Sequence, residues 1–276
     1  MKKQRYLFLS DVHLCRHSWY GVSAEERLLR MTEQLEKRAS EVHFDDMFLL
    51  GDVSLDFWAY EEGGTFLHDP PVSNTERFLR EIYPRLPMKA HLIPGNHEQY
   101  GEELWKKLTG TPRSYTVVPD VPDAPVFVML DTFGGNLDPR ENSDGTFTPC
   151  DCARIRAALD AYPGRRVILC AHWFSPEQES AEFRTLVSEE KRIPVLLMGH
   201  THRSSVIENA FGSKAILQCG NFSYSSENPS ESSFWGWREL EISETGAMSS
   251  YYYVPAQTTP ACTVETHQQD FWEYAE

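Results

Sequence analysis

The chain has few basic side chains for its length. Its 276 residues include 26 Lys and Arg against 41 Asp and Glu, so the formal net charge is −15 at pH 7. A surface that holds a nucleic-acid backbone needs clustered Lys and Arg, and we find no basic run of that kind. The composition therefore makes a nucleic-acid partner unlikely.

Long apolar runs are also missing. The N-terminal stretch MKKQRYLFLS carries three basic residues, and Asp11 and His13 interrupt the apolar run that follows them. This run is too short for the core of a signal peptide or for a membrane span. We expect a cytoplasmic protein with no membrane partner.

The six cysteines lack the spacing of a disulfide framework. Cys170 lies inside the apolar run VILCAH, and Cys150 and Cys152 are closer together than the cysteines of common zinc motifs. We expect reduced thiols with mainly structural roles.

No repeat, low-complexity block or linker divides the chain. Hydrophobic residues make up 41% of it, which is enough for one large core. We predict a single domain over residues 1–276. In this prediction, one sheet with most of the candidate site is built from about 1–204, and a second sheet and the C-terminal tail from about 205–276.

Short apolar runs alternate with helical patterns. Continuous runs of strand length suit a sheet that is covered on both faces, and the alternation predicts an α/β layered fold. Helices are expected from Ser23, which has a capping-box partner in Glu26, from Asn74 and from Asp151. The predicted strands are 5–11, 46–53, 89–96, 125–132, 166–172 and 194–200.

The last third of the chain has a different pattern. Residues 234–243 and 248–254 alternate in hydrophobicity around a Glu-Thr-Gly turn and are predicted to form a hairpin. The acidic, aromatic tail QQDFWEYAE either docks or is disordered. Two connections, 54–74 and 133–149, exceed ordinary loop lengths, and such loops are often functional.

Polar side chains gather at the ends of the predicted strands. The carboxyl ends of parallel strands share one edge of a sheet, so residues remote in sequence would meet there. Five of the ten histidines are among them, and the mixed oxygen and nitrogen set suits Zn, Fe, Mn or Co. The residues are Asp11, His13, Asp52, Asn96, His97, Glu98, His172, His200 and His202.

Two of these pairs are separated by a single residue. If the backbone stays extended, this spacing points Asp11 and His13 to one side, and likewise His200 and His202. Glycines before three of the candidates give the backbone room to turn sharply. Each residue taken alone has an ordinary alternative role as a turn former, a helix cap or a hydrogen-bonded core histidine.

The order of these blocks is Asp-x-His, Gly-Asp, Gly-Asn-His-Glu, His and Gly-His-Thr-His. It resembles the signature of the calcineurin-like metallophosphoesterase superfamily. The resemblance spans residues 11–202. It implies an α/β four-layer sandwich, in which two mixed β-sheets are flanked by helices, and a centre of two divalent or trivalent metal ions drawn from Mn, Fe, Zn and Co.

The resemblance also implies roles for individual residues. Asp11, His13 and His202 would bind one ion, and Asn96, His172 and His200 the other. Asp52 would bridge both ions. His97 would lie just outside them, where it could protonate or stabilise the leaving oxygen. The catalytic residues would therefore be His97 and Asp52.

The implied reaction is hydrolysis of a small phosphorylated substrate, a phosphodiester or phosphomonoester, by in-line attack of a hydroxide that bridges the metals. The stretch GDVSLDFWAY lacks the arginine that follows Gly-Asp in protein Ser/Thr phosphatases of the superfamily, and the chain has no basic run of the kind expected in its nucleases. It therefore resembles the cyclic-nucleotide phosphodiesterase-like and generic phosphoesterase branch, and a phosphodiesterase is favoured over a phosphomonoesterase. Two alternatives stay open: activity like that of a protein Ser/Thr phosphatase, and a non-catalytic, metal-binding scaffold for protein assembly.

The loops near the candidate site add aromatic and basic side chains. Aromatic rings there can sandwich a flat group, although packing onto the core is the alternative. Arg16 and Arg203 are candidates for contact with a phosphate. The aromatic candidates are His17, Trp19, Tyr20, Phe57, Trp58, Tyr60, Tyr100, Trp173 and Phe174.

Overall fold

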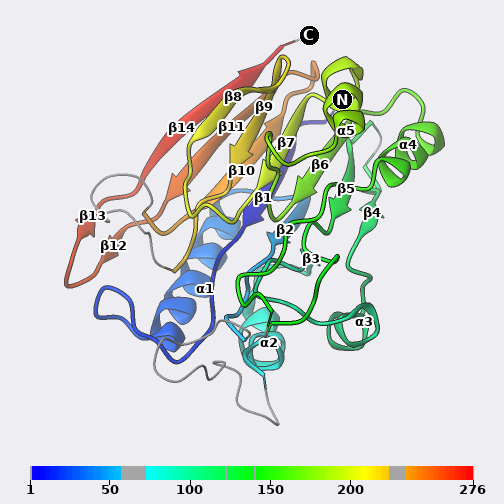
Figure 1. Cartoon of the computed structure of the whole chain (residues 1–276). Coiled ribbons are helices and arrows are strands. Elements are labelled where there is room, and N and C mark those ends of the chain that lie inside the picture. The colour runs from blue at the N-terminus through cyan, green and yellow to red at the C-terminus, as the bar shows by residue number, and fades with distance from the viewer. Residues whose placement is uncertain (1, 57–72, 122, 140, 224–233, 276) are drawn as a thin grey trace.

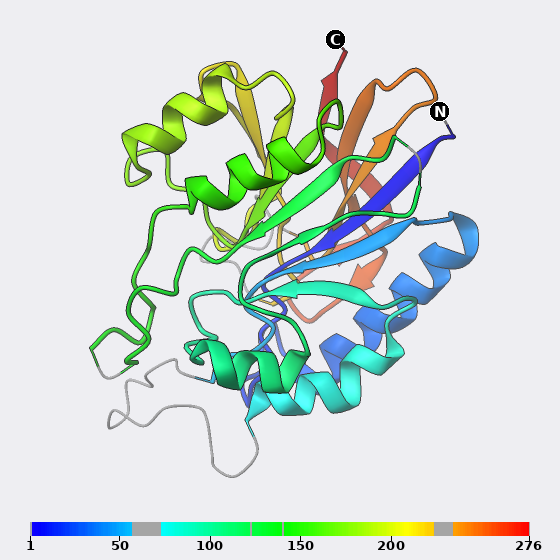
Figure 2. The same ribbon diagram turned by 90° about the vertical axis from the view of Figure 1, so that its right-hand side faces the viewer.

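The computed structural model describes residues 2–56, 73–121, 123–139, 141–223 and 234–275. Two six-stranded sheets stack face to face, and helices cover both outer faces (Figures 1 and 2). Each sheet contains both parallel and antiparallel pairs. This arrangement is the four-layer α/β sandwich of two mixed sheets that the family resemblance implies.

The first sheet combines the beginning and the end of the chain. Three parallel neighbours, β1 (Gln4–Leu9), β2 (Asp46–Leu50) and β3 (Ala90–Ile93), form one half. The other half is antiparallel and consists of β10 (Trp237–Ile242), β11 (Met248–Val254) and β14 (His267–Tyr274). The spatial order is β14-β11-β10-β1-β2-β3.

The second sheet comes from the middle of the chain. Its strands are β4 (Tyr115–Val117), β5 (Val126–Leu130), β6 (Val167–Ala171), β7 (Val195–Met198), β8 (Val206–Phe211) and β9 (Lys214–Gln218). They lie in the order β4-β5-β6-β7-β9-β8. A separate two-stranded ribbon is formed by β12 (Gln257–Thr258) and β13 (Thr263–Val264).

The predicted division of the sheets near residue 204 is wrong. The hairpin of β10 and β11 forms as expected, but β10 pairs with β1 in the first sheet. The physical reason is that alternating hydrophobicity along a segment identifies it as a strand but does not indicate which strand it pairs with in a sheet. Here Leu240 and Ile242 join the apolar cluster that also holds Tyr6 and Phe8 of β1.

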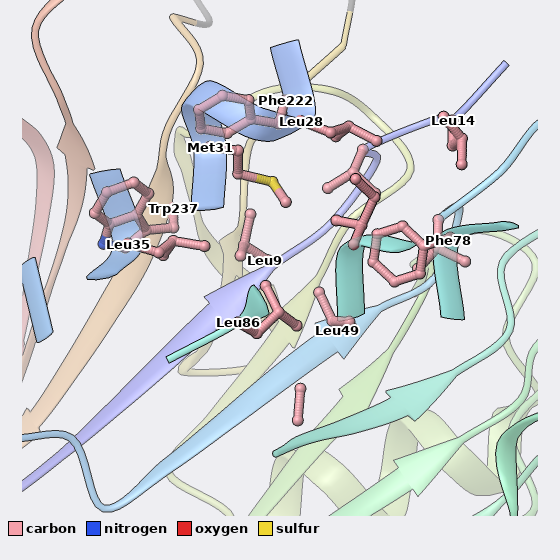
Figure 3. Packing of buried hydrophobic residues seen from close by; sticks show 14 of the residues in the cluster. Leu9, Leu14, Leu28, Met31, Leu35, Leu49, Phe78, Leu86, Phe222 and Trp237 are labelled. Atoms are coloured by element: carbon pink, nitrogen blue, oxygen red, sulfur yellow. The ribbon is translucent and has the colours of Figure 1, made fainter. Parts of the chain in front are cut away.

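Both faces of β1 are buried, which explains its continuous apolar run. Tyr6 and Phe8 point between the sheets, where the ring of Phe8 stacks on Phe48 at 4.8 Å between centroids. The alternate residues Leu7 and Leu9 belong to the cluster on the outer face of the sheet. Figure 3 shows Leu28, Met31 and Leu35 of the covering helix packed there with Leu9 and Leu49.

Helix α1 (Ala24–Glu41) covers the first sheet, and the hydroxyl of Ser23 accepts a hydrogen bond from the amide of Glu26, as predicted. Asp151 caps α4 (Cys152–Ala161), also as predicted. Helix α2 (Asn74–Arg77) is capped by Ser73 rather than Asn74, and it continues as a π-helical turn (Phe78–Ile82) and a 3-10 turn (Tyr83–Arg85). Helices α3 (Glu102–Thr109) and α5 (Ala181–Glu189) were not predicted.

The C-terminal tail docks as the edge strand β14, with Trp272 buried against the sheet and Phe271 63% exposed. All six cysteines are unpaired, and five of them are buried. Across the described ranges, the helices are all too short or too polar to cross a bilayer.

Candidate metal centre

The carboxyl ends of both sheets meet at one place. The loops that follow β1 and β2 run together, because the amide of His13 donates to the carbonyl of Asp52 at 3.0 Å. From the second sheet, the amide of His200 after β7 donates to the Asp11 carboxylate at 2.8 Å. The strand-end residues that are remote in sequence therefore lie side by side.

The first group of side chains consists of Asp11, His13 and His202, whose ligand atoms lie within 4.8 Å of one another. Oδ1 of Asp11 is 3.7 Å from Nε2 of His13 and 3.3 Å from Nε2 of His202. The Asp11 side chain is fully buried, and that of His202 is 11% exposed. We call this set the Asp11 group.

The second group, the Asp52 group, consists of Asp52, His172 and His200. Asn96 joins it, because its Oδ1 lies 2.9 Å from Nε2 of His172 and 3.0 Å from Nδ1 of His200. Oδ2 of Asp52 is 3.2 Å from Nε2 of His172. These are the three residues that the family resemblance assigns to a second ion, together with Asp52 as the bridge.

Asp52 stands between the two groups. Its Oδ2 is also 3.2 Å from Nε2 of His13, a member of the Asp11 group. Its Oδ1 accepts a hydrogen bond from the backbone amide of His97 at 3.1 Å. One carboxylate therefore contacts imidazoles of both groups, as a bridging ligand must.

The backbone of the site is not extended, so the geometric reason given for the Asp-x-His and His-x-His spacing is wrong. Five of the nine non-glycine residues with positive φ in the described ranges are candidate ligands: Asp11 (54°), His13 (46°), Asp52 (53°), His200 (66°) and His202 (58°). Such a conformation costs about 1–3 kcal/mol per residue and clusters at functional sites. The turns let His200 and His202 reach different groups from one loop.

Two glycines are required by close approach of the backbone to these side chains. A Cβ atom at Gly95 would overlap the carboxylate of Asp52, and one at Gly199 would overlap Ser10 and Asp11. Only glycine fits at both positions.

The donor set fits cations because acceptor atoms face one another. The Nδ1 of His172 lies 2.6 Å from the carbonyl of Leu50, so a neutral ring donates there and presents its Nε2 lone pair to Asn96 and Asp52. Oδ1 of Asp11 accepts no hydrogen bond from the described residues. Buried lone pairs this close repel unless a proton or a metal ion lies between them.

The electrostatics agree with this interpretation. Burial lowers the pKa of His13 and of His200 to about 4, so both rings are neutral and able to act as ligands at pH 7. Burial also opposes the charged form of His172, but Asp52 outweighs it and raises the pKa of His172 to about 9. Without a cation, a proton on His172 therefore offsets the Asp52 charge.

Glu98 is a functional residue to which the sequence pattern assigned no role. Its fully buried carboxylate accepts hydrogen bonds from the amides of Asp52 and Gly95 at 2.8 Å and of Ser54 at 2.9 Å. It thereby ties the Gly-Asp loop to the Gly-Asn-His-Glu loop. Its place directly after His97 was the only available signal.

Arg27 is the second such residue. Its guanidinium is fully buried and donates to the carbonyls of Val12, His13 and Phe222, which fixes the loop that carries Asp11 and His13. Burial lowers the pKa of Arg27 to about 10. In the sequence, Arg27 stands beside the apolar residues of α1, and this position could have indicated a buried cation.

His97 lies beside the Asp52 carboxylate, and its predicted role at the leaving oxygen stays a prediction. Its Nε2 is 4.0 Å from Oδ2 of Asp52, and its side chain is 11% exposed. Burial lowers the pKa of His97. The ring is therefore close to the metal ligands without belonging to either group.

The 133–149 connection packs against the Asp52 group. The ring of Trp173 lies 4.7 Å from that of His200, and Phe133 and Phe147 pack on Trp173 at 6.3 and 5.1 Å. The amide of Gln99 donates to the carbonyls of residues 142 and 143. This loop forms one wall of the site.

The other aromatic candidates divide into several classes. Phe174 is buried in the core, and Tyr100 is buried with its hydroxyl donating to Asp56. His17, Trp19 and Tyr20 are half-buried after the Asp-x-His turn. Phe57, Trp58 and Tyr60, with most of the 54–74 connection, lie outside the described residues. Arg16 and Arg203 are exposed on the loops that carry ligands, and their contact with phosphate stays a prediction.

The family model described as calcineurin-like phosphoesterase matches residues 4–204. The chain therefore belongs to this family. The match contains every strand end that carries a candidate ligand. No curated protein sequence matches the chain.

Solved structures share the fold at low sequence identity. GAP50, described as the anchor in the inner membrane complex of Plasmodium, has a TM-score of 0.60 and 14% identity, covering 99% of this chain and 90% of its own. Purple acid phosphatase PPD1 from yellow lupin seeds has a TM-score of 0.55 and 12% identity, covering 97% of this chain and 53% of its own. A putative 5'-nucleotidase from Staphylococcus aureus has a TM-score of 0.51 and 14% sequence identity, covering 98% of this chain and 54% of its own.

Proposed function

We propose that the chain is a phosphoric ester hydrolase that uses two metal ions, one in the Asp11 group and one in the Asp52 group. The observation that carries the proposal is the position of Asp52, whose Oδ2 lies 3.2 Å from an imidazole nitrogen of each group. A carboxylate shared in this way suits two adjacent cations. The set of ligands with Asp52 as the bridge is part of the proposal.

Two such cations would activate water and neutralise charge on the phosphoryl oxygens. Asn96 and the imidazoles hold the site with few negative charges, which favours an anionic substrate. The water oxygen bonds to phosphorus as the bond from phosphorus to the leaving oxygen breaks in line with it. His97, whose ring lies outside both groups, would donate a hydrogen bond, and in the transition state a proton, to that leaving oxygen.

We infer a preference for phosphodiesters of small molecules. The chain has no arginine in the stretch after Gly51 and Asp52 where the protein phosphatases of the superfamily carry one. The half-buried rings of Phe147 and Trp173, backed by the buried Phe133, offer apolar surface to a second ester group.

The test is hydrolysis of a chromogenic phosphodiester and the matching phosphomonoester by metal-depleted protein reconstituted with Mn²⁺, with Asp52→Asn as the control. Faster diester cleavage that disappears in the variant supports the proposal. Faster monoester cleavage changes the assignment to a phosphatase. Activity without added metal, equal in the variant, contradicts the mechanism.

A non-catalytic scaffold is the second candidate, because the Plasmodium protein with the same fold is described as an anchor. The two candidates differ in what the reconstituted protein does. A scaffold hydrolyses neither ester after reconstitution, even when metal analysis finds two ions per chain.

A further inference from the structure

The last strand of the chain, β14, contains a β-bulge. In its pairing with β11, Tyr252 faces Gln269 and Ser250 faces Trp272, so two residues of β14 stand opposite one residue of β11. Asp270 is one of those two residues, and its φ is 51°. Bulges re-aim side chains and are frequent beside active sites, and a residue with positive φ is held in that conformation by its surroundings. The contacts of Asp270 therefore indicate what the bulge is for.

The side chain of Asp270 contacts the loop that carries two candidate ligands. His200 and His202 lie in the connection between β7 and β8, and Ser204 follows them there. The buried hydroxyl of Ser204 donates to Oδ2 of Asp270. The side-chain amide of Gln269 donates to both partners, at 2.9 Å to Oγ of Ser204 and at 3.0 Å to Oδ2 of Asp270. Figure 1 shows β14 beside β8, which begins where this loop ends.

A buried arginine connects the same two segments through their backbones. Arg238 of β10 is fully buried, and its guanidinium donates to the carbonyl of Ser204 and, at 3.1 Å, to the carbonyl of Asp270. It also donates to the carbonyl of Gln218 at the end of β9, at 2.8 Å. Because the guanidinium is planar and its donors have fixed directions, it holds the bulge and the ligand loop in one relative position.

These contacts support His202 more directly than His200. His200 is held from another direction, because its amide donates to the Asp11 carboxylate at 2.8 Å. His202 stands two residues before Ser204, and its carbonyl accepts a hydrogen bond from the side chain of Asn221 at 2.8 Å. The shortest connection from the bulge therefore leads to the ligand that belongs to the Asp11 group.

We propose that Asp270 is a positioning residue of the metal centre, which acts through Ser204 on the loop from which His202 reaches the Asp11 group. This inference rests on the proposed function, because it concerns the ion that this group would hold. Asp270 lies beyond residues 4–204, which match the family model. The matched segment supplies the ligands, and the C-terminal strand keeps one of them in place.

The test is a titration of metal-depleted Asp270→Gly with Mn²⁺, followed by electron paramagnetic resonance. Glycine accepts positive φ, so this variant removes the side-chain contact without adding backbone strain. The Mn²⁺ site that Asp11→Asn removes should lose about tenfold in affinity, the lower end of the range for loss of a supporting contact. The site that Asp11→Asn retains should bind Mn²⁺ as in the original protein.

Asn209→Gly is the matched control. Asn209 is an exposed residue with a φ of 55° in the irregular part of β8, so the same kind of replacement is made in another strand. It should leave both Mn²⁺ sites unchanged. Urea denaturation of both variants measures any general loss of stability, which by itself would not weaken one site selectively.

Two further variants examine the contact itself. Ser204→Ala removes the hydroxyl and should weaken the same site, and combining it with Asp270→Gly should cause no further loss, because both changes break one contact. Asp270→Asn keeps an acceptor oxygen and tolerates positive φ, so it should retain most of the affinity.

Unchanged affinity in Asp270→Gly overturns the inference, and so does equal weakening of both sites. Full affinity in Ser204→Ala overturns the route through the hydroxyl. If the original protein lacks two Mn²⁺ sites, the proposed function fails, and this inference fails with it.

Discussion

The two halves of the candidate metal centre are supported by opposite charges. Behind the Asp11 group, the buried guanidinium of Arg27 holds backbone carbonyls. Behind the Asp52 group, the buried carboxylate of Glu98 holds backbone amides. Each of these side chains fixes a strained turn, because it forms hydrogen bonds with backbone groups that the turn itself leaves without partners.

This difference predicts that the two proposed ion positions would not be equivalent. Burial and the nearby Asp52 charge raise the pKa of Glu98 to about 8, so Glu98 would add its negative charge when a cation close to the Asp52 group favours the ionised form. The guanidinium near the Asp11 group adds positive charge. The Asp52 group also has the amide oxygen of Asn96 beside it, which the proposal uses as an additional ligand. We therefore expect the tighter ion in the Asp52 group, and the following variants test that asymmetry.

Replacement of the shared carboxylate has the largest expected effect. Asp52→Asn removes the charge that contacts both groups, so metal content should fall from about two ions per chain toward none and hydrolysis should fall by more than about 10⁴-fold, beyond the range of general acid loss. Asp11→Asn should leave about one ion. Elemental analysis after gel filtration measures both. Equal loss in the two variants would contradict the bridging position of Asp52.

His97→Ala should lower turnover by about two to four orders of magnitude, the usual range for loss of a general acid or base. Metal content should stay the same, because His97 belongs to neither group. The measurement pairs steady-state rates with elemental analysis of one preparation. Loss of metal in this variant would show that His97 is a ligand, which is a different role from the proposed one.

Removal of the metals should make the pH dependence of stability bell-shaped. Burial lowers the folded pKa of His13 and His200 to about 4, so their contribution is lost as the pH falls from 6.5 toward 4. Burial opposes charge on His172, yet Asp52 raises its folded pKa to about 9, so its contribution is complete below pH 6.5 and is lost as the pH rises through 9. Burial raises the folded pKa of Glu98 to about 8, so this acid also loses stability as the pH rises toward 8. The part of the alkaline loss that comes from His172 is on the order of 3 kcal/mol.

Urea denaturation of the protein after its metals have been removed with a chelator, at pH 5, 6.5 and 9, measures the loss of stability on the acid side and on the alkaline side. Mn²⁺ should abolish the alkaline limb, because a ligated His172 cannot take up a proton. A metal-free protein that is as stable at pH 9 as at pH 6.5 would show that His172 is neutral, and the electrostatic account of the Asp52 group would fail.

Local sequence signals predicted the strands and the candidate ligands but not their neighbours. Apolar runs located β1, β2, β3, β5, β6 and β7, and the polar residues after them meet as expected. The pairing of β10 with β1 was missed because it joins segments more than 200 residues apart and leaves no local trace.

The turns of the site show a second limit. The spacing of His200 and His202 was interpreted for an extended backbone, whereas both residues have positive φ. Such conformations are imposed by tertiary contacts, such as the bond from the His200 amide to Asp11, and propensity does not predict them. Glu98 and Arg27 were overlooked for the same reason, since their partners are backbone groups from other segments.

The smallest expected effect isolates the support behind the Asp52 group. Glu98→Gln preserves shape but replaces one acceptor oxygen by a donor, so either the amide of Ser54 or those of Asp52 and Gly95 would face an N–H group. Loss of such supporting contacts typically costs 10- to 100-fold in metal affinity. Ser54→Ala is a milder comparison, because it keeps the hydrogen bond from the Ser54 amide to Glu98 and removes the longer one from the hydroxyl at 3.4 Å. In a Mn²⁺ titration followed by electron paramagnetic resonance, Glu98→Gln should weaken one of two sites, and Asp11→Asn should remove the other. If Glu98→Gln weakens both sites equally, the carboxylate acts on the whole centre and the asymmetry between the groups does not exist.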